Sequence, residues 1–80
     1  MKAQVYDEIE TLMDVQSEFR NRIIPKGTHG TVVERYEYPR EGYAVDLALP
    51  DDTQLDTGFD FENVVLFPDQ FVVVPTARRS

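Results

Sequence analysis

The chain offers few side chains that could serve as a nucleophile or a general base. His29 is the only histidine, Ser17 and Ser80 are the only serines, and there is no cysteine. A hydrolytic triad needs a serine or cysteine held against a histidine that a third group orients. His29 lies between Thr28 and Gly30 in a predicted turn, where a solvated role is expected. We therefore predict no catalytic residues and a protein that is not an enzyme.

Carboxylates are the one chemically active group that the sequence supplies in number. Residues 41–70 contain eight Asp and Glu residues and no Lys or Arg. Paired carboxylates cleave glycosidic bonds only where a cleft raises the pKa of one of them. A chain of 80 residues forms a single small core, which leaves little room for such a cleft. A carboxylate-based hydrolase is therefore the least favoured of the functions considered.

The same acidic stretch resembles a set of calcium ligands, with Gly58 nearby. Its members are Asp51, Asp52, Asp56 and Asp60. A calcium loop of the EF-hand type needs a glycine at its sixth position and a glutamate at its twelfth. Counted from Asp52, these positions hold Thr57 and Asn63. A solvated acidic loop is the better interpretation, and we predict no metal and no cofactor.

Three tyrosines, Tyr36, Tyr38 and Tyr43, suggest a binding surface. Tyr36 and Tyr38 point the same way if their strand extends that far, and with Pro39 and Phe71 they would form an aromatic groove of the kind that binds proline-rich segments. The alternative is that these rings fill the core, because the chain has no tryptophan. We expect Tyr43 to be at least partly buried and Tyr38 to be exposed.

Composition excludes several classes of protein. The net charge is -7 and the pI is about 4.4, which disfavours nucleic-acid binding because that affinity comes largely from Lys and Arg. An RNA-binding role for the turn near Gly27 would rest on Lys26 and His29 alone. No apolar run approaches a membrane span, and the first residues lack the apolar core of a signal peptide. We expect a folded, cytoplasmic protein that binds neither nucleic acid nor membrane.

Apolar residues mostly repeat with the period of two that is typical of strands. We predict strands over 30–36, 43–49, 59–67 and 71–74, a hairpin loop over 38–42 and a helical turn over 68–70. The segment 6–13 fits either a helix or a strand. Residues 1–74 form one domain, and 75–80 a flexible tail.

The predicted core takes residues from each of these strands. It consists of Ile9, Val33, Tyr43, Val45, Leu47, Phe61, Val64, Leu66, Phe67 and Phe71. Gly27 and Gly30 stand three apart in the turn before the first long strand. Glycine is needed where the backbone has a positive φ or where two strands approach closely. Both requirements are expected at a strand reversal in a barrel.

Two short motifs carry a resemblance to a known family. Residues 26–33, Lys-Gly-Thr-His-Gly-Thr-Val-Val, and residues 68–71, Pro-Asp-Gln-Phe, resemble motifs of the small bacterial SH3-like barrel proteins grouped as domain-of-unknown-function family 4926. Asp69 and Phe71 stand where the family has Glu and Leu. The resemblance spans about residues 5–74 and implies an all-β, five-stranded SH3-like barrel with a short helical turn before the last strand. It favours a strand for the opening segment and implies no activity.

The function that these features favour is a non-catalytic, acidic protein-binding module. Its most concrete form is an immunity or antitoxin protein that neutralises a basic toxin, because a field of one sign speeds association with an oppositely charged cleft. The candidate partner-binding residues are Asp46, Asp51, Asp52, Asp56, Asp60, Glu62, Tyr36 and Tyr38. The alternative is a structural or accessory subunit that binds through a strand edge or the aromatic groove.

Overall fold

The protein is built from strands joined by short turns. The computed structural model describes residues 2–17, 21–50 and 59–75, without the side chains of Pro50, Phe59 and Asp60. The strands in this part of the chain are β1 (Glu8–Thr11), β2 (Val15–Gln16), β3 (Ile23–Ile24), β4 (His29–Tyr36), β5 (Gly42–Pro50), β6 (Phe59–Leu66) and β7 (Phe71–Val73). One 3₁₀ turn, η1 (Pro68–Gln70), lies directly before β7. The predicted all-β class, the opening strand and the helical turn are confirmed. The predicted tail lies outside the described residues except for its first residue.

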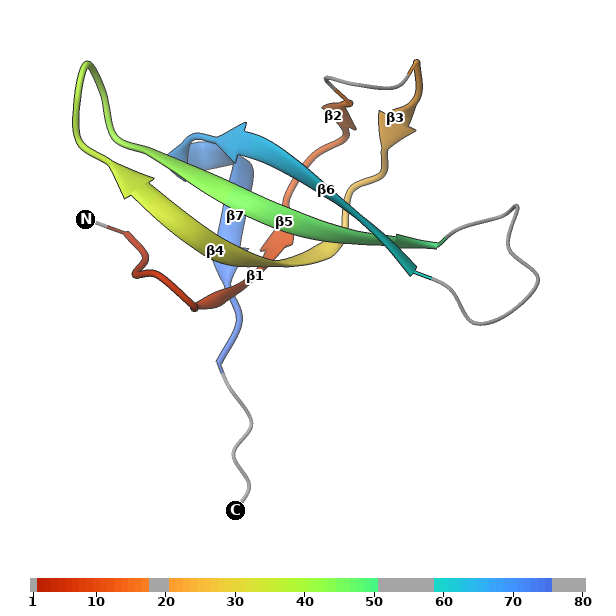
Figure 1. Ribbon diagram of the computed structural model, residues 1–80, viewed down its shortest axis with the longest axis horizontal. Helices are drawn as coiled ribbons and strands as arrows, with labels where there is room; N and C mark the ends of the chain where they lie inside the picture. Colours follow the sequence, from red (N-terminus) through yellow and green to blue (C-terminus); the bar gives the residue numbers. More distant parts are fainter. Residues whose placement is uncertain (1, 18–20, 51–58, 76–80) are drawn as a thin grey trace.

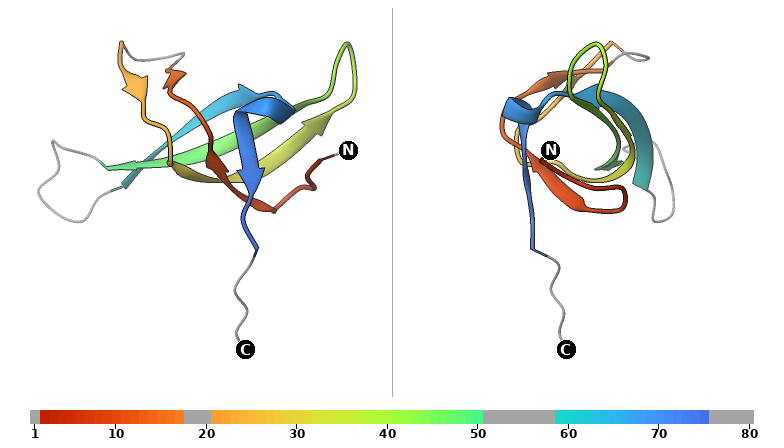
Figure 2. Two further views of the ribbon diagram at one scale, coloured as in Figure 1. Left: turned by 180° about the vertical axis from the view of Figure 1, so that it is seen from behind. Right: turned by 90° about the vertical axis from the view of Figure 1, so that its left-hand side faces the viewer.

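Five of the strands form one antiparallel sheet in the order β6-β5-β4-β1-β7. The sheet curls strongly around its core (Figure 2). The prediction of a closed five-stranded barrel is wrong, because no backbone pairing joins the outer strands β6 and β7 among the described residues. Phe67 and η1 separate β6 from β7, and β7 pairs along its three residues with β1 instead.

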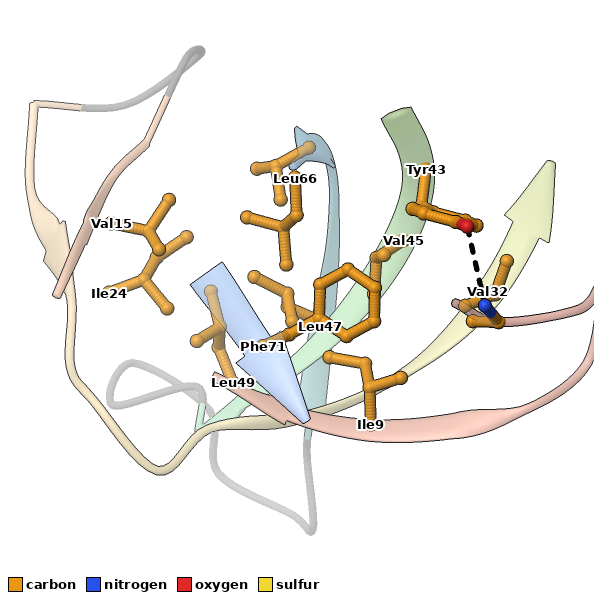
Figure 3. Close-up of a cluster of buried hydrophobic side chains, with 12 residues drawn as sticks. Ile9, Val15, Ile24, Val32, Tyr43, Val45, Leu47, Leu49, Leu66 and Phe71 are labelled. Carbon is orange, nitrogen blue, oxygen red and sulfur yellow. Dashed lines mark hydrogen bonds between the residues drawn. The ribbon is translucent and has the colours of Figure 1, made fainter. Parts of the chain in front are cut away.

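A second, two-stranded unit completes the core. The β2–β3 hairpin lies outside the main sheet. The sequence did not predict it, because strands of two residues are too short to show a period. It contributes Val15 and Ile24 to the hydrophobic cluster (Figure 3). The buried cluster consists of Ala3, Ile9, Val15, Ile24, Val32, Tyr43, Val45, Leu47, Leu49, Val64, Leu66 and Phe71.

Three residues of the predicted core, Val33, Phe61 and Phe67, are not part of the buried cluster. A β-bulge interrupts β4 between Val32 and Glu34, so that Val32 faces the core and Val33 is 38% exposed. A bulge inserts one unpaired residue and shifts the alternation of the strand beyond it. In β6 the inward residues are Glu62, Val64 and Leu66, which leaves Phe61 65% exposed. Phe67 is half-buried.

The turn that precedes β4 uses its two glycines in the two predicted ways. Gly27 has a φ of +89°, and a Cβ on Gly30 would lie 2.7 Å from the carbonyl oxygen of Asp46. The buried Thr11 side chain holds this turn, because its Oγ1 accepts the amide of Thr28 at 3.0 Å and donates to the carbonyl of Pro25 at 3.2 Å. β1 is thereby fixed to the start of β4.

Within the described residues, no helix is long and apolar enough to cross a bilayer.

Candidate partner-binding site

The β4–β5 hairpin projects from one end of the sheet, as the loop that runs from yellow to green in Figure 1 shows. Residues 33–40 are all exposed, and Gly42 is the first residue of β5. The loop contains a cis peptide bond between Tyr38 and Pro39. The predicted hairpin loop over residues 38–42 is confirmed except at Gly42, which belongs to β5. Its side chains therefore lie where a partner can reach them without disturbing the core.

Adjacent residues of the hairpin face opposite sides of the sheet. Arg35 is opposite Tyr43, and Tyr36 is opposite Gly42. Since successive side chains of a strand alternate and Tyr43 is buried in the core, the Arg35–Tyr43 pair lies on the concave side. The Tyr36–Gly42 pair lies on the convex side. A shallow cavity is found at each of the two positions, and Tyr36 lines both.

The convex-side cavity, which we call the aromatic groove, has a volume of about 270 Å³. It is lined by Tyr36, Tyr38, Pro39, Arg40, Gly42, Val65 and Phe67. Gly42 forms part of its floor, since a Cβ there would lie 3.4 Å from the Phe67 ring. The guanidinium carbon of Arg40 lies 3.9 Å from the centre of the same ring, within cation–π distance. The groove is therefore apolar, with one positive charge stacked against its wall.

The concave-side cavity, which we call the carboxylate pocket, has a volume of about 260 Å³. It is lined by Arg35, Tyr36, Glu37, Glu41 and Tyr43. Neither Arg35 nor Glu37 has a hydrogen-bond or ion-pair partner in the part of the chain that the structure describes. Two carboxylates and an aromatic residue are the groups that bind a lysine or arginine side chain.

The Glu41 carboxylate is fixed and kept ionised by a small network. It accepts hydrogen bonds from the Tyr43 hydroxyl and, at 2.8 Å, from the backbone amide of Lys2. The Tyr43 hydroxyl in turn accepts the Lys2 and Ala3 amides at 2.8 and 3.3 Å. The hydrogen bond from Tyr43, followed by that from Lys2, lowers the pKa of Glu41 below its usual 4.5, because both donors favour the charged form. Glu41 therefore keeps its negative charge into mildly acidic solution.

The two tyrosines predicted to bind a partner do line one cavity. Tyr38 is 87% exposed, as predicted, and Tyr36 is 38% exposed. Phe71, the other ring of the predicted groove, is instead buried in the core and packs edge-to-face on Tyr43 at 5.3 Å between ring centres. The groove takes its other aromatic wall from Phe67.

The predicted acidic contact residues divide into three groups. Asp46 is half-buried, and its Oδ1 accepts a 2.9 Å hydrogen bond from Asn63. Glu62 is only 5% exposed and accepts a hydrogen bond from Ser17, so its carboxylate faces inward and does not form part of a contact surface. Asp51, Asp52, Asp56 and the side chain of Asp60 lie outside the described residues.

The candidates for catalysis and metal binding are separated in the fold. His29 is exposed at the start of β4, with its Nε2 3.7 Å from Oε1 of Glu10. Ser17 is buried beside Glu62. In the described part of the chain, no group of three or more His, Cys, Asp or Glu side chains is arranged to hold a metal ion. The aspartates considered for calcium lie mostly outside that part.

Pro39 lines the aromatic groove as predicted, but the lining residues from outside the tyrosine group were otherwise not predicted from the sequence. Val65 and Phe67 reach the groove from β6 and the residue that follows it, and Glu37 and Glu41 meet across the hairpin loop. The proximity of Glu37 and Glu41 could have been predicted from the sequence, because residues that flank a short hairpin loop at equal distances face each other. No local signal links β6 to the loop.

Together, the fold and the site define a small acidic all-β protein with a projecting hairpin and a cavity on each of its faces. Comparisons of the chain with protein-family models, with curated proteins and with solved structures found no match. The resemblance to the SH3-like family thus stays a prediction.

Proposed function

We propose that this chain is a non-catalytic module of the cytoplasm that binds a protein partner with a basic surface. The observation that carries the proposal is the projecting β4–β5 hairpin, which exposes Tyr36 and Tyr38 beside the aromatic groove. Tyrosine and arginine are enriched among residues that dominate binding energy. Tyr38 shares the lining of this groove with Tyr36, Val65 and Phe67, and a contiguous apolar surface of this kind is typical of an interaction site.

The charge of the chain supports a basic partner. The net charge is -7, and a field of one sign raises the rate of association with an oppositely charged surface. The most concrete form of the proposal is an immunity or antitoxin protein that neutralises a basic toxin. This form rests on the size and charge of the chain and carries no motif of its own.

A structural or accessory subunit is the second candidate, and the outer edge of β6 favours it. β6 runs from Phe59 to Leu66 and pairs only with β5 among the described residues. An unpaired edge of this length can accept a strand from another chain. Phe61 and Val65 stand exposed along the outer face of the same strand.

The two candidate functions predict different neighbouring genes. A toxin-neutralising protein should be encoded beside its toxin, and an accessory subunit beside the other subunits of its enzyme. We would co-express the chain with the product of the neighbouring reading frame and measure both rescue of growth and the rate of association at about 50 and 500 mM salt. Neutralisation predicts rescue and an association that slows markedly as salt rises. A partner that is an enzyme subunit, bound without salt dependence, would contradict the toxin form of the proposal.

A further inference from the structure

Two cavities of different chemistry meet at a single residue of the hairpin, Tyr36. The aromatic groove has apolar walls, whereas the carboxylate pocket contains Glu37 and the hydrogen-bonded Glu41. From this juxtaposition we infer that one segment of a basic protein partner occupies both, with an apolar side chain in the groove and a neighbouring lysine or arginine in the pocket. The inference rests on the proposed function and specifies which part of the partner is bound.

The backbone leaves a path for such a segment between the two faces. β1 pairs with β4 only at His29, Gly30 and Thr31. The next residue, Val32, accepts a backbone hydrogen bond from Tyr6 and donates one to Asp7. Beyond the bulge, the edge of β4 that faces away from β5 has no strand partner among the described residues. A segment that crosses this edge near Tyr36 passes from the convex side of the sheet to the concave side.

The charged residues that line each cavity determine which side chain of the segment enters it. In the groove the only charged lining group is Arg40, whose guanidinium is stacked on Phe67, so a second cation there would be repelled. The pocket is lined by two carboxylates, Glu37 and Glu41, and by one cation, Arg35, so negative groups outnumber positive ones in its lining. A cationic side chain is therefore attracted to the pocket and an apolar one to the groove. An acidic segment would be opposed by the net charge of -7, because like charges across an interface repel.

The hairpin is also prepared for binding before the partner arrives. The strands on either side of the loop are held by the pairs Arg35 with Tyr43 and Tyr36 with Gly42, and the Glu41 carboxylate is held by Tyr43 and Lys2. Groups that are already ordered lose less conformational entropy on association. Glu37 and Tyr38, both exposed at the tip, have no partner within the described structure and remain available for one.

The test uses short random peptides displayed on phage as the probe and the whole chain as the bait. Selected peptides should carry a lysine or arginine within a few residues of a leucine, isoleucine, valine or aromatic residue. With the synthetic form of the strongest peptide, Tyr38→Ala should raise Kd by about tenfold or more. Glu37→Gln should raise it by roughly threefold and reduce its dependence on salt.

Two matched variants serve as controls for these substitutions. Tyr6→Ala removes a tyrosine that is 79% exposed on a different turn, and Glu8→Gln removes one negative charge from β1. Neither residue lines the cavities around Tyr36, so both variants should leave Kd within about twofold of the parent value. All four altered side chains are exposed, and the variants should therefore keep the melting temperature of the parent chain.

Three results would overturn the inference. The first is a selection that yields no peptide above background. The second is binding that is unchanged by Tyr38→Ala, and the third is an equal effect of Glu37→Gln and Glu8→Gln. A protein partner that binds the chain in a salt-dependent manner but ignores Tyr38 and Glu37 would refute the two-cavity site and leave the proposed function standing.

Discussion

The most exacting test of the fold is the replacement of Gly30 by alanine. The new Cβ would lie 2.7 Å from the carbonyl oxygen of Asp46 and 2.8 Å from side-chain atoms of both Val45 and Leu47. Contacts this short require a shift of β4 against β5, and overpacking of this kind costs about 1–3 kcal/mol. A domain of this size loses roughly 4–8 °C of melting temperature per kcal/mol. For a cost in the middle of that range, Gly30→Ala should melt about 8–16 °C lower than the parent chain.

Gly42→Ala is the matched control, because it makes the same chemical change in the neighbouring strand. Its Cβ would meet only the Phe67 ring and a methyl group of Val65, at 3.4 Å and beyond. Melting followed by circular dichroism, with the same buffer and protein concentration for both variants, measures the difference. If the two variants melt within about 2 °C of each other, the close approach of β4 and β5 at Gly30 is wrong.

Three further predictions concern the core, the pH dependence and metal ions. Val45 has no exposed surface, so Val45→Asp should abolish cooperative melting by burying an unpaired carboxylate at a cost of several kcal/mol; a soluble variant with a sharp transition would mean that the faces of β5 are reversed. The pKa of Glu41 is lowered in the folded chain, which gives stability that is present above the pKa of the unfolded chain and is lost as pH falls through the folded pKa. The melting temperature should therefore fall less between about pH 6 and pH 3 in Glu41→Gln than in the parent, and parallel curves would contradict the network around Tyr43. A chelator should leave the melting temperature unchanged, and a large drop would point to a structural calcium ion bound by Asp52, Asp56 and Asp60.

The strand faces were predictable where the hydrophobic pattern is regular and each residue obeys it. Tyr43, Val45 and Leu47 alternate with smaller or polar residues, and all three are buried as predicted. The pattern fails in β6, where it predicts Phe61 in the core and Glu62 on the surface. The structure reverses them, because Glu62 shares its face with the buried part of β6 and is hydrogen-bonded by Ser17. A rule based on polarity cannot foresee a buried carboxylate whose partner is distant in the sequence.

The candidate site was predictable only in its local part. The spacing of Tyr36 and Tyr38 indicated a shared surface, and Tyr38 was expected to be exposed. The groove itself depends on β5 and β6 lying side by side, which brings Val65 and Phe67 over Gly42. That proximity follows from the register of the sheet, and register is a property of paired strands that neither strand specifies alone.

The bulge at Val33 decides which residues the hairpin presents. Val32 is opposite Val45, and the next paired residue, Glu34, is opposite Ala44. If Val33 were paired in the ladder instead, every later residue of β4 would move on by one place, and Arg35 rather than Tyr36 would stand opposite Gly42. The loop sequence would be intact, yet the groove would receive a cation and lose an aromatic wall. A slip of one residue at this point would therefore exchange the side chains that the hairpin presents on its two faces, and it would change both cavities together.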